Sequence, residues 1–479
     1  MTNTLNISLS RDTGEALADQ IVRSVSARID ERLLRPGARM PSIRRFAGTH
    51  GVSPFTVVAS YDRLVAQGYL ESRRGAGFFV RERVQAPSVA RVAASAAPIP
   101  SATLDVAWLI RNMFRQAPLQ RSPGAGVLPA DWLDGPAVAK ALAGLSRQNS
   151  AGFLGYGAPQ GFLPLRQQLQ LKLAEFEIEA PPAQIVMTVG VTQALDLVAR
   201  EFCRPGDTIL VDDPAWFLMF GSFAAMGLNV VGVRRLADGP DLEQLAELAA
   251  LYRPCLYVIN SVLHNPTSTS LSAAKAFQVL RLAEQHGFTV VEDDIYADLH
   301  PGSGIQPATR LAALDGLRQV IYLGGFSKSM APNLRVGFIA ASSERAQRLA
   351  DRKMLATLTT SDIGERVVYK ILSEGLYRKH LDRVRNRLDA VRPKALRQLE
   401  ALGLRPEPAP SAGMFVWVDA GCDTNAVAAR AMQDDLLLAP GSLFSPKQLP
   451  STRMRVNVAA LQDAGTMRLL EQALRISSA

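Results

Sequence analysis

The chain has 479 residues but only three cysteines, Cys203, Cys255 and Cys422, which are scattered along it. Their spacing matches neither a zinc site nor a disulfide framework, so we expect no metal site and no disulfide. Such sparse cysteine is typical of a protein that works in a reducing cytosol.

The sequence also lacks any uninterrupted apolar run that is long enough to cross a bilayer. Its first residues have neither the charged nor the apolar region of a signal peptide. We therefore expect a cytoplasmic protein with no membrane contact. Hydrophobic residues make up 48% of the chain and charged residues 20%, as in globular proteins with a full core, and the length predicts more than one domain.

The sequence has no internal repeat, and its net charge is +9. That charge permits binding to a polyanion but does not establish it, because many basic proteins bind none. Between about residues 84 and 101 the chain becomes rich in Ala, Pro and Ser, which predicts an interdomain linker. We expect a first domain at 1–84, a linker at 85–115 with a short amphipathic stretch at 106–114, and a second domain at 116–479.

The first domain opens with apolar residues at four-residue spacing, which indicates one face of a helix. They are Leu17, Ile21, Val25, Ile29 and Leu33. A Pro-Gly pair at 36–37 ends this helix. Ser42 is placed to cap a second helix, and Ser53, followed by proline, is placed to cap a third.

The buried side of the third helix is predicted from its apolar residues, Val57, Val58, Tyr61, Leu64 and Val65. Residues 69–80 have the pattern of a strand, a glycine turn and a second strand. Three helices followed by a β-hairpin make a small α+β unit, the winged helix-turn-helix.

Several residues of this unit suit a nucleic acid. The first turn of the third helix offers hydroxyls and an aromatic ring, and arginines from the second helix and the hairpin suit phosphates and guanine. These residues are Ser53, Phe55, Thr56, Arg44, Arg45, Arg73 and Arg74. The alternative is a protein-binding module with ordinary surface arginines.

The unit resembles the winged-helix domain of GntR-type bacterial regulators. The similarity lies in Pro36-Gly-Ala-Arg-Met-Pro-Ser-Ile-Arg-Arg45, in Gly51-Val-Ser53, and in the stretch from Leu64 to Val80. The resemblance implies DNA contacts by Arg44, Ser53, Phe55, Thr56, Arg74 and Gly75. Pro54 departs from the polar or basic residue of many members, which puts base contacts at that position in doubt.

After the linker, short apolar runs alternate with helical stretches, which predicts an α/β fold with a mostly parallel sheet covered by helices. The runs are 185–189, 208–212, 256–260, 288–293, 320–323 and 338–340. Ligands of such sheets bind at the carboxyl ends of the strands. Most polar residues of interest in this chain follow such a run.

Lys328 follows one of these runs in a loop of small residues, and Arg335 lies shortly after it. A lysine with a nearby arginine suits a Schiff-base site with an anion clamp. Taken alone, such a lysine is more often a solvated surface residue. Other groups in the chain, each weak in isolation, favour the site.

Gly190-Val-Thr opens a helix whose N–H groups suit a phosphate. Trp216 suits stacking on a flat ring or plain core packing, and Asn265-Pro-Thr suits donation to a phenolate or a simple turn. Asp293 and Tyr296 end a strand, where a carboxylate suits a ring nitrogen or a helix cap. Together these groups match the aldehyde, phenolate, ring nitrogen and phosphate of pyridoxal 5'-phosphate (PLP).

Across about residues 116–479 the chain resembles fold-type I PLP-dependent aminotransferases, because these motifs occur in the same order. The resemblance implies a Schiff base at Lys328, an Asp293 contact to the pyridine nitrogen, and phenolate contacts from Tyr296 and Asn265. It also implies stacking by Trp216 and a phosphate site. The phosphate site would comprise Ser327, Arg335 and the amides of Val191 and Thr192.

Two further roles follow from this resemblance. Tyr156 would reach the phosphate of the neighbouring subunit in a homodimer, and Arg455 would bind the carboxylate of an amino acid. The chain departs from the family pattern at two positions. Gly325 replaces a serine that often contacts the phosphate, and Ser268 replaces the usual glycine after Thr267, so we expect a looser phosphate clamp and a different local turn.

The whole chain resembles the MocR subfamily of GntR-type regulators. This implies a transcription regulator that binds promoter DNA and senses PLP, or the aldimine of PLP with an amine or amino acid. An active aminotransferase that carries a DNA-binding module is the alternative, and Arg455 favours it. A third hypothesis is a protein-binding winged helix on a PLP-free domain, which Lys328, Asp293 and Arg335 oppose.

Overall fold

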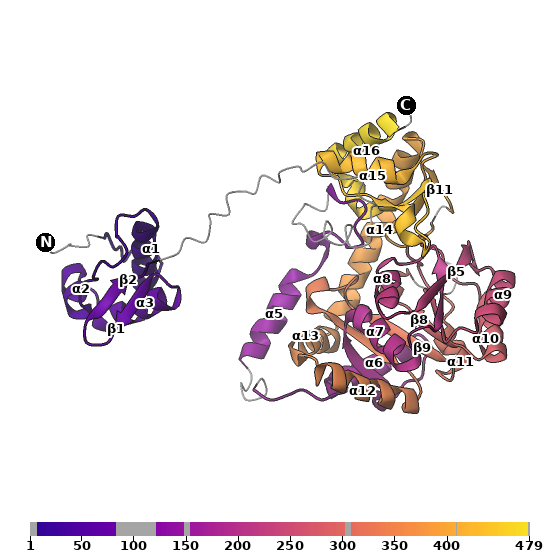
Figure 1. Ribbon diagram of the computed structural model, residues 1–479, viewed down its shortest axis with the longest axis horizontal. Helices are drawn as coiled ribbons and strands as arrows, with labels where there is room; N and C mark the ends of the chain where they lie inside the picture. The colour runs from indigo at the N-terminus through magenta and orange to yellow at the C-terminus, as the bar shows by residue number, and fades with distance from the viewer. Residues whose placement is uncertain (1–6, 83–120, 148–153, 302–307, 409, 478–479) are drawn as a thin grey trace. The chain divides into compact units, whose positions relative to one another are not determined.

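The computed structural model describes residues 7–82, 121–147, 154–301, 308–408 and 410–477 (Figure 1). The chain divides into two compact units, Met1–Ser101 and Ala102–Ala479. The predicted linker and the predicted amphipathic stretch within it lie outside the described residues, so the predicted domain limits remain predictions.

Within its described residues, 7–82, the N-terminal unit has three helices and a two-stranded antiparallel sheet. They are α1 (Leu17–Asp30), α2 (Ile43–His50), α3 (Pro54–Ala66), β1 (Leu70–Arg73) and β2 (Gly77–Val80). The side chain of Ser42 accepts the N–H of Arg45 at 3.3 Å, and that of Ser53 accepts the N–H of Thr56 at 3.1 Å. Both predicted caps are therefore present, because each serine satisfies an N–H that the helix leaves open.

This unit has its own hydrophobic core, in which Ile21, Val25, Tyr61 and Leu64 are fully buried. Two residues assigned to the core from sequence are exposed. Val58 on α3 is 37% exposed, and Leu33, at 65%, lies beyond the end of α1. The stripe fails at Leu33 because Arg32 takes a left-handed backbone conformation (φ 59°), so the helical spacing no longer applies.

The C-terminal unit is built on an eight-stranded sheet of order β3-β10-β9-β8-β7-β4-β5-β6. The strands are β3 (Ile185–Val189), β4 (Thr208–Asp213), β5 (Asn229–Leu236), β6 (Gly239–Pro240), β7 (Leu256–Ile259), β8 (Thr289–Asp293), β9 (Val320–Gly325) and β10 (Val336–Ala340). Pairing is parallel from β5 through β4, β7 and β8 to β9, and β10 runs antiparallel to β9 and β3. The predicted mostly parallel sheet is confirmed.

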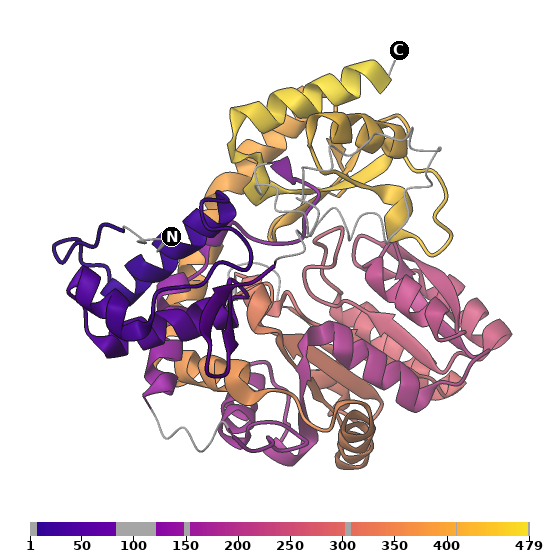
Figure 2. The ribbon, with the colours of Figure 1, turned by 60° about the vertical axis from the view of Figure 1, so that its left-hand side comes forward.

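Helices cover both faces of this sheet (Figure 2). Successive residues of one strand enter different cores: Leu210 belongs to one hydrophobic cluster and Val211 to the other, and both clusters include residues of helices. A strand buried on both faces is expected to be continuously apolar, as the sequence runs are.

The helices of this unit are α5 (Gly135–Ser146), α6 (Leu163–Ala174), α7 (Gly190–Phe202), α8 (Leu218–Ala225), α9 (Leu242–Tyr252), α10 (Ala273–His286), α11 (Leu311–Asp315), α12 (Ser343–Thr357), α13 (Asp362–Ser373), α14 (Leu376–Ala401), α15 (Thr424–Ala431) and α16 (Ala464–Ser477). Short 3₁₀ turns lie between them, including η5 (Ala297–Leu299) and η6 (Pro332–Leu334).

A smaller antiparallel sheet has the order β11-β12-β14-β13 and carries Arg455. Its strands are β11 (Arg405–Pro406), β12 (Phe415–Asp419), β13 (Ala439–Pro440) and β14 (Arg453–Asn457). Figure 1 shows it beside α15 and α16, above the larger sheet, with the long α14 running between the two. No sequence pattern predicted this sheet.

Cys203 and Cys255 form a disulfide with their Cα atoms 6.1 Å apart, so the expectation of no disulfide is wrong. Cys203 directly follows α7 and Cys255 directly precedes β7. The fold brings them together although they are 52 residues apart in the sequence.

No helix among the described residues is both long and apolar enough to cross a membrane. In the same residues, no group of three or more His, Cys, Asp or Glu side chains is arranged to hold a metal ion.

Two successive arginines of β5 allow a matched test of stability. Arg235 pairs with Asp212 at 2.8 Å with both side chains 1% exposed, whereas Arg234 pairs with Asp241 and is 68% exposed. Arg235→Ala leaves a buried carboxylate without its cation, so we expect a loss of about 3–5 kcal/mol in the free energy of unfolding. Arg234→Ala should cost about 0–1 kcal/mol. Urea unfolding measures the free energy of unfolding of both variants. Equal losses would contradict the larger contribution that we assign to the buried ion pair.

Candidate cofactor cavity and DNA-facing surface

A cavity of about 600 Å³ lies where the carboxyl ends of β4, β7 and β8 meet the N-terminus of α7. Nine of the residues that sequence analysis assigned to a cofactor line it: Val191, Thr192, Trp216, Asn265, Asp293, Tyr296, Ser327, Lys328 and Arg335. They come from six separate stretches of the chain. The fold thus gathers the predicted residues around one space.

Lys328 lies in the loop after β9. Its Nζ donates to the carbonyl of Gly126 at 2.8 Å. The pKa of this amine is lowered to about 8, first by burial and then by the positive charges of Arg455 and Arg335, while the charge of Asp293 acts in the opposite direction. A substantial neutral fraction near neutral pH is what a Schiff-base nucleophile requires.

Asp293 ends β8 and accepts the N–H of Ile295 through Oδ1 at 3.1 Å. Its pKa is raised to about 7, chiefly by burial, while the Ile295 amide and the Lys328 charge act in the opposite direction. A cationic partner would return this carboxyl to its ionised form, because an opposite charge favours it. A protonated ring nitrogen is such a partner.

Asn265 and Tyr296 face the cavity as a hydrogen-bonded pair. Nδ2 of Asn265 donates to the Tyr296 hydroxyl at 3.2 Å, and its Oδ1 accepts from Nη1 of Arg455 at 2.8 Å. Burial raises the pKa of Tyr296 above its usual value, so the phenol stays protonated and can donate.

Arg455 on β14 is 2% exposed and lies over the rings of Phe415 and Phe444, at 4.4 and 5.0 Å from their centroids. Its Nη2 donates to the carbonyl of Gly124 at 2.6 Å. Burial lowers the pKa of the guanidinium to about 10. A buried cation of this kind is suited to a ligand carboxylate.

The other end of the cavity is a cradle for an anion. Gly190 begins α7 with a φ of +72°, and a Cβ placed on it would approach Nη2 of Arg335 to 2.6 Å. Arg335 also donates to the Ser327 hydroxyl at 3.4 Å and to the Val189 carbonyl at 3.2 Å. A helix N-terminus with an adjacent guanidinium suits a phosphate. This donor set fits the phosphate of PLP, and Lys328 and Asp293 fit its aldehyde and ring nitrogen.

Two departures from the family pattern have local explanations. Ser268 has a φ of 55°, so the serine adopts the left-handed conformation that glycine favours. A Cβ on Gly325 would lie 3.0 Å from Cδ1 of Ile295 and 3.2 Å from the Val336 carbonyl, so the site is too tight for a side chain without a small shift.

Tyr156 lies away from this cavity and is 85% exposed. Several residues that touch the site were not identified from sequence, and three of them have polar roles. Gly124 and Gly126 accept from Arg455 and Lys328, and Asn260 lines the cavity. The glycines lie in an irregular segment with no periodic signal, and only the fold brings that segment to the site.

The predicted DNA contacts form an exposed set on the N-terminal unit: Arg44, Ser53, Phe55, Arg74 and Gly75 are exposed, and Thr56 is half-buried. Phe55, in the first turn of α3, is 88% exposed, which is unusual for so large an apolar side chain. Arg73 pairs with Glu71 and lies over the Phe79 ring. Within the described residues, Arg44 and Arg74 form no ion pair and remain available for phosphates.

Comparisons with known proteins bear on both units. A family model for aminotransferases of class I and II matches residues 124–472, and a model for bacterial regulatory proteins of the gntR family matches residues 17–80. The uncharacterized HTH-type transcriptional regulator YdfD of Bacillus subtilis (strain 168) is 27% identical over 460 residues, 93% of each chain.

The probable rhizopine catabolism regulatory protein MocR of Rhizobium meliloti is 28% identical over 394 residues, which cover 81% of this chain and 77% of that protein. LysN, an alpha-aminoadipate aminotransferase from Thermus thermophilus solved with N-(5'-phosphopyridoxyl)-L-leucine, matches with a TM-score of 0.70. It is 28% identical and covers 77% of this chain and 95% of its own. The chain therefore belongs to the class I and II aminotransferase family, in the arrangement of MocR-type regulators, with a gntR-family helix-turn-helix region ahead of the aminotransferase fold.

Proposed function

We propose that this protein is a cytoplasmic, homodimeric transcription regulator that binds PLP and responds to an amine or amino acid. The observation that carries the proposal is the pairing of two features in one chain. A lysine of lowered pKa shares a cavity with Asp293 and the Arg335 cradle, and a separate unit exposes arginines and Phe55 for DNA. PLP, when bound, would supply an electron-withdrawing ring.

Each of these residues would contact a different part of PLP. Lys328 would attach the aldehyde, Asp293 would hold the ring nitrogen, and Trp216 would stack on the ring. Asn265 and Tyr296 would contact the phenolate oxygen. The phosphate would lie against a set comprising Ser327, Arg335 and the amides of Val191 and Thr192. Tyr156, being exposed, would reach the phosphate of a second subunit.

Arg455 supports an amino-acid effector, because a buried guanidinium suits a carboxylate. The solved relative LysN carries a leucine joined to the phosphopyridoxyl group. We propose that this cavity accepts a ligand of the same class, with its carboxylate on Arg455.

The segment 121–128 offers a route from the ligand to DNA. Its carbonyls at Gly124 and Gly126 accept from Arg455 and Lys328, so a ligand that engages both side chains competes with the segment. Asn457 holds the same segment through the carbonyls of Ala125 and Val127, at 3.0 and 2.7 Å. In sequence, the segment lies just after the predicted linker to the DNA-binding unit.

An active aminotransferase is the second candidate, because Lys328 and Arg455 are the groups that such an enzyme uses. Steady turnover with an amino acid and a 2-oxo acid, unchanged when the N-terminal unit is removed, would favour it. Footprinting that shows no protected DNA with or without PLP would count against the regulator.

Replacement of Lys328 tests the attachment site. Lys328→Ala should remove the visible Schiff-base absorbance of bound PLP. Lys353→Gln is the matched control, because Lys353 is also buried with a pKa lowered to about 8 but donates to Thr360 outside the cavity. An unchanged spectrum in Lys328→Ala would refute the assignment.

The same lysine sets a pH dependence. A lowered pKa means that the neutral amine predominates above about pH 8 instead of above its usual value. The rate of Schiff-base formation, followed by absorbance after mixing with PLP, should therefore rise with pH and level off above about 8. A rate that keeps rising toward pH 10 would contradict the lowered pKa.

The exposed arginines predict how strongly the affinity for DNA depends on salt concentration. Arg44→Ala and Arg74→Ala should each weaken binding to promoter DNA and reduce the slope of log affinity against log salt by about 1. Arg23→Ala serves as control, because Arg23 is already paired with Glu15 at 2.7 Å. Fluorescence anisotropy across a salt series measures the slopes, and equal slopes in all variants would argue against this surface.

Asn457→Ala tests the route through segment 121–128. Loss of its two hydrogen bonds to the segment should leave PLP absorbance in place but reduce, severalfold, the change in DNA affinity caused by added amino acids. Asn425→Ala is the control, because it removes a side-chain hydrogen bond with Ser442 instead of one to segment 121–128. It should respond like the unmodified protein. An undiminished response in Asn457→Ala would exclude this route.

A further inference from the structure

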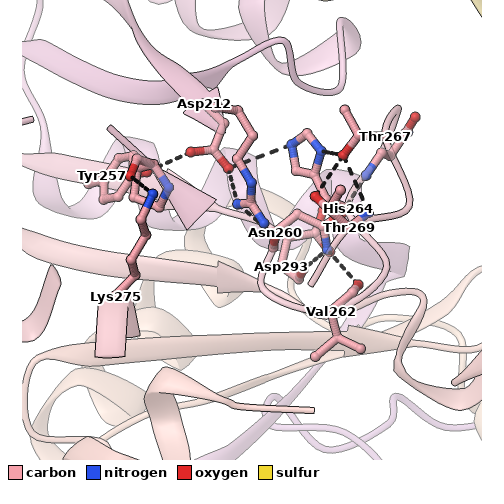
Figure 3. Close-up of polar contacts among 12 residues, drawn as sticks. Asp212, Tyr257, Asn260, Val262, His264, Thr267, Thr269, Lys275 and Asp293 are labelled. Atoms are coloured by element: carbon pink, nitrogen blue, oxygen red, sulfur yellow. Dashed lines mark hydrogen bonds and ion pairs between the residues drawn. The ribbon is translucent and has the colours of Figure 1, made fainter. Parts of the chain in front are cut away.

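Asn260 directly follows β7 and links the loop after β7 to the end of β8. Its Oδ1 accepts the N–H of Asn265 at 2.8 Å, and its Nδ2 donates to the backbone carbonyl of Asp293 at 2.5 Å. Figure 3 shows the contacts of Asn260 to Asp293 and Val262. One side-chain amide therefore ties together two residues of the cavity wall.

The two tied residues carry most of the polar contacts proposed for the cofactor ring. Asp293 offers its carboxylate, and Asn265 is bonded both to the Tyr296 hydroxyl and to Arg455. A displacement at Asn260 would move these groups relative to one another. Binding of a rigid ring requires that their separation stay fixed.

Asn260 is itself anchored through its backbone carbonyl. Nη1 of Arg235 donates to the Asn260 carbonyl at 3.3 Å and to Oδ2 of Asp212 at 2.8 Å. The hydroxyl of Tyr257 donates to the other oxygen of Asp212 at 2.6 Å (Figure 3). Because the ion pair is buried and hydrogen-bonded on both sides, it holds the backbone of Asn260 in place.

Position 260 requires a side chain that both donates and accepts a hydrogen bond. The side chain must accept from one backbone group and donate to another, in opposite directions, and an amide does both. An aspartate of the same shape can accept from Asn265, but it places an oxygen against the Asp293 carbonyl. The position therefore distinguishes asparagine from its isostere.

We propose that Asn260 is a positioning residue of the cofactor site, which fixes Asp293 relative to Asn265 and its partners Tyr296 and Arg455. The inference rests on the proposed function, because the held groups matter in this way only if PLP binds between them. It assigns Asn260 a role in cofactor affinity and in the pH response of the bound cofactor.

The test compares Asn260→Ala and Asn260→Asp with Asn229→Ala in the full-length protein. Asn229 is a suitable control because it also donates to a side chain of the large sheet, Thr208 at 3.0 Å, but lies outside the cavity. The dissociation constant for PLP, from fluorescence titration, should rise about tenfold in both Asn260 variants and stay unchanged in the control.

A second readout separates positioning from mere loss of stability. The pH at which the absorbance of bound PLP changes should shift by about one unit in the Asn260 variants, because Asp293 no longer lies in its place. Unfolding temperatures without PLP are measured alongside. A variant that lowers the unfolding temperature yet keeps both the affinity and the pH midpoint would overturn the proposal.

Failure of the inference and failure of the proposed function look different. If the unmodified protein shows no PLP absorbance, the proposed function falls, and the inference falls with it. If the unmodified protein binds PLP and the Asn260 variants bind it equally well, the inference alone is wrong. Should Asn260→Ala fail to fold, Asn260→Asp decides the question, because it keeps the volume and the bond from Asn265.

Discussion

The parallel pairing of β4, β7 and β8 is the constraint on which the candidate site depends. Parallel neighbours end at the same edge of a sheet, so the residues that end or follow these strands, Trp216, Asn260 and Asp293, are delivered to one edge. The antiparallel β10 completes the arrangement. Its register pairs Val336 with Val189, which sets Arg335 beside the first residues of α7. An anion cradle thus results from strand register and not from a continuous motif.

Burial then gives the gathered groups their properties. The pKa of Lys328 falls and that of Asp293 rises chiefly because withdrawal from water disfavours both charged forms. Their mutual attraction offsets this only in part. A ligand that brings a positive ring nitrogen to Asp293 and an aldehyde to Lys328 relieves both costs, which is why the cavity suits PLP better than a simple anion.

The sequence predicted what depends on local signals. Ser42 and Ser53 were identifiable as caps because each bond spans only three residues. Most of the cavity residues were identifiable because they end or follow a short apolar run and occur in the order of the family pattern, whereas Arg335 lies just before such a run. Contacts between distant segments could not be predicted from the sequence. They are the Cys203–Cys255 disulfide, the hydrogen bonds of Asn260, and the small sheet, two of whose strands are two residues long. None of these has a periodicity or spacing from which it follows.

The structure also bears on the choice between sensor and enzyme. In an enzyme, Lys328 would bond covalently to the cofactor and Arg455 would hold the substrate carboxylate. Here each of them also donates to segment 121–128, so ligand binding and the placement of that segment draw on the same donors. Two events that compete for one set of hydrogen bonds are thermodynamically coupled, and the coupling is reciprocal. If DNA binding favours one placement of the segment, it must alter ligand affinity by the same factor. An arrangement of this kind serves a regulator directly, whereas for catalysis it adds a competitor to the substrate.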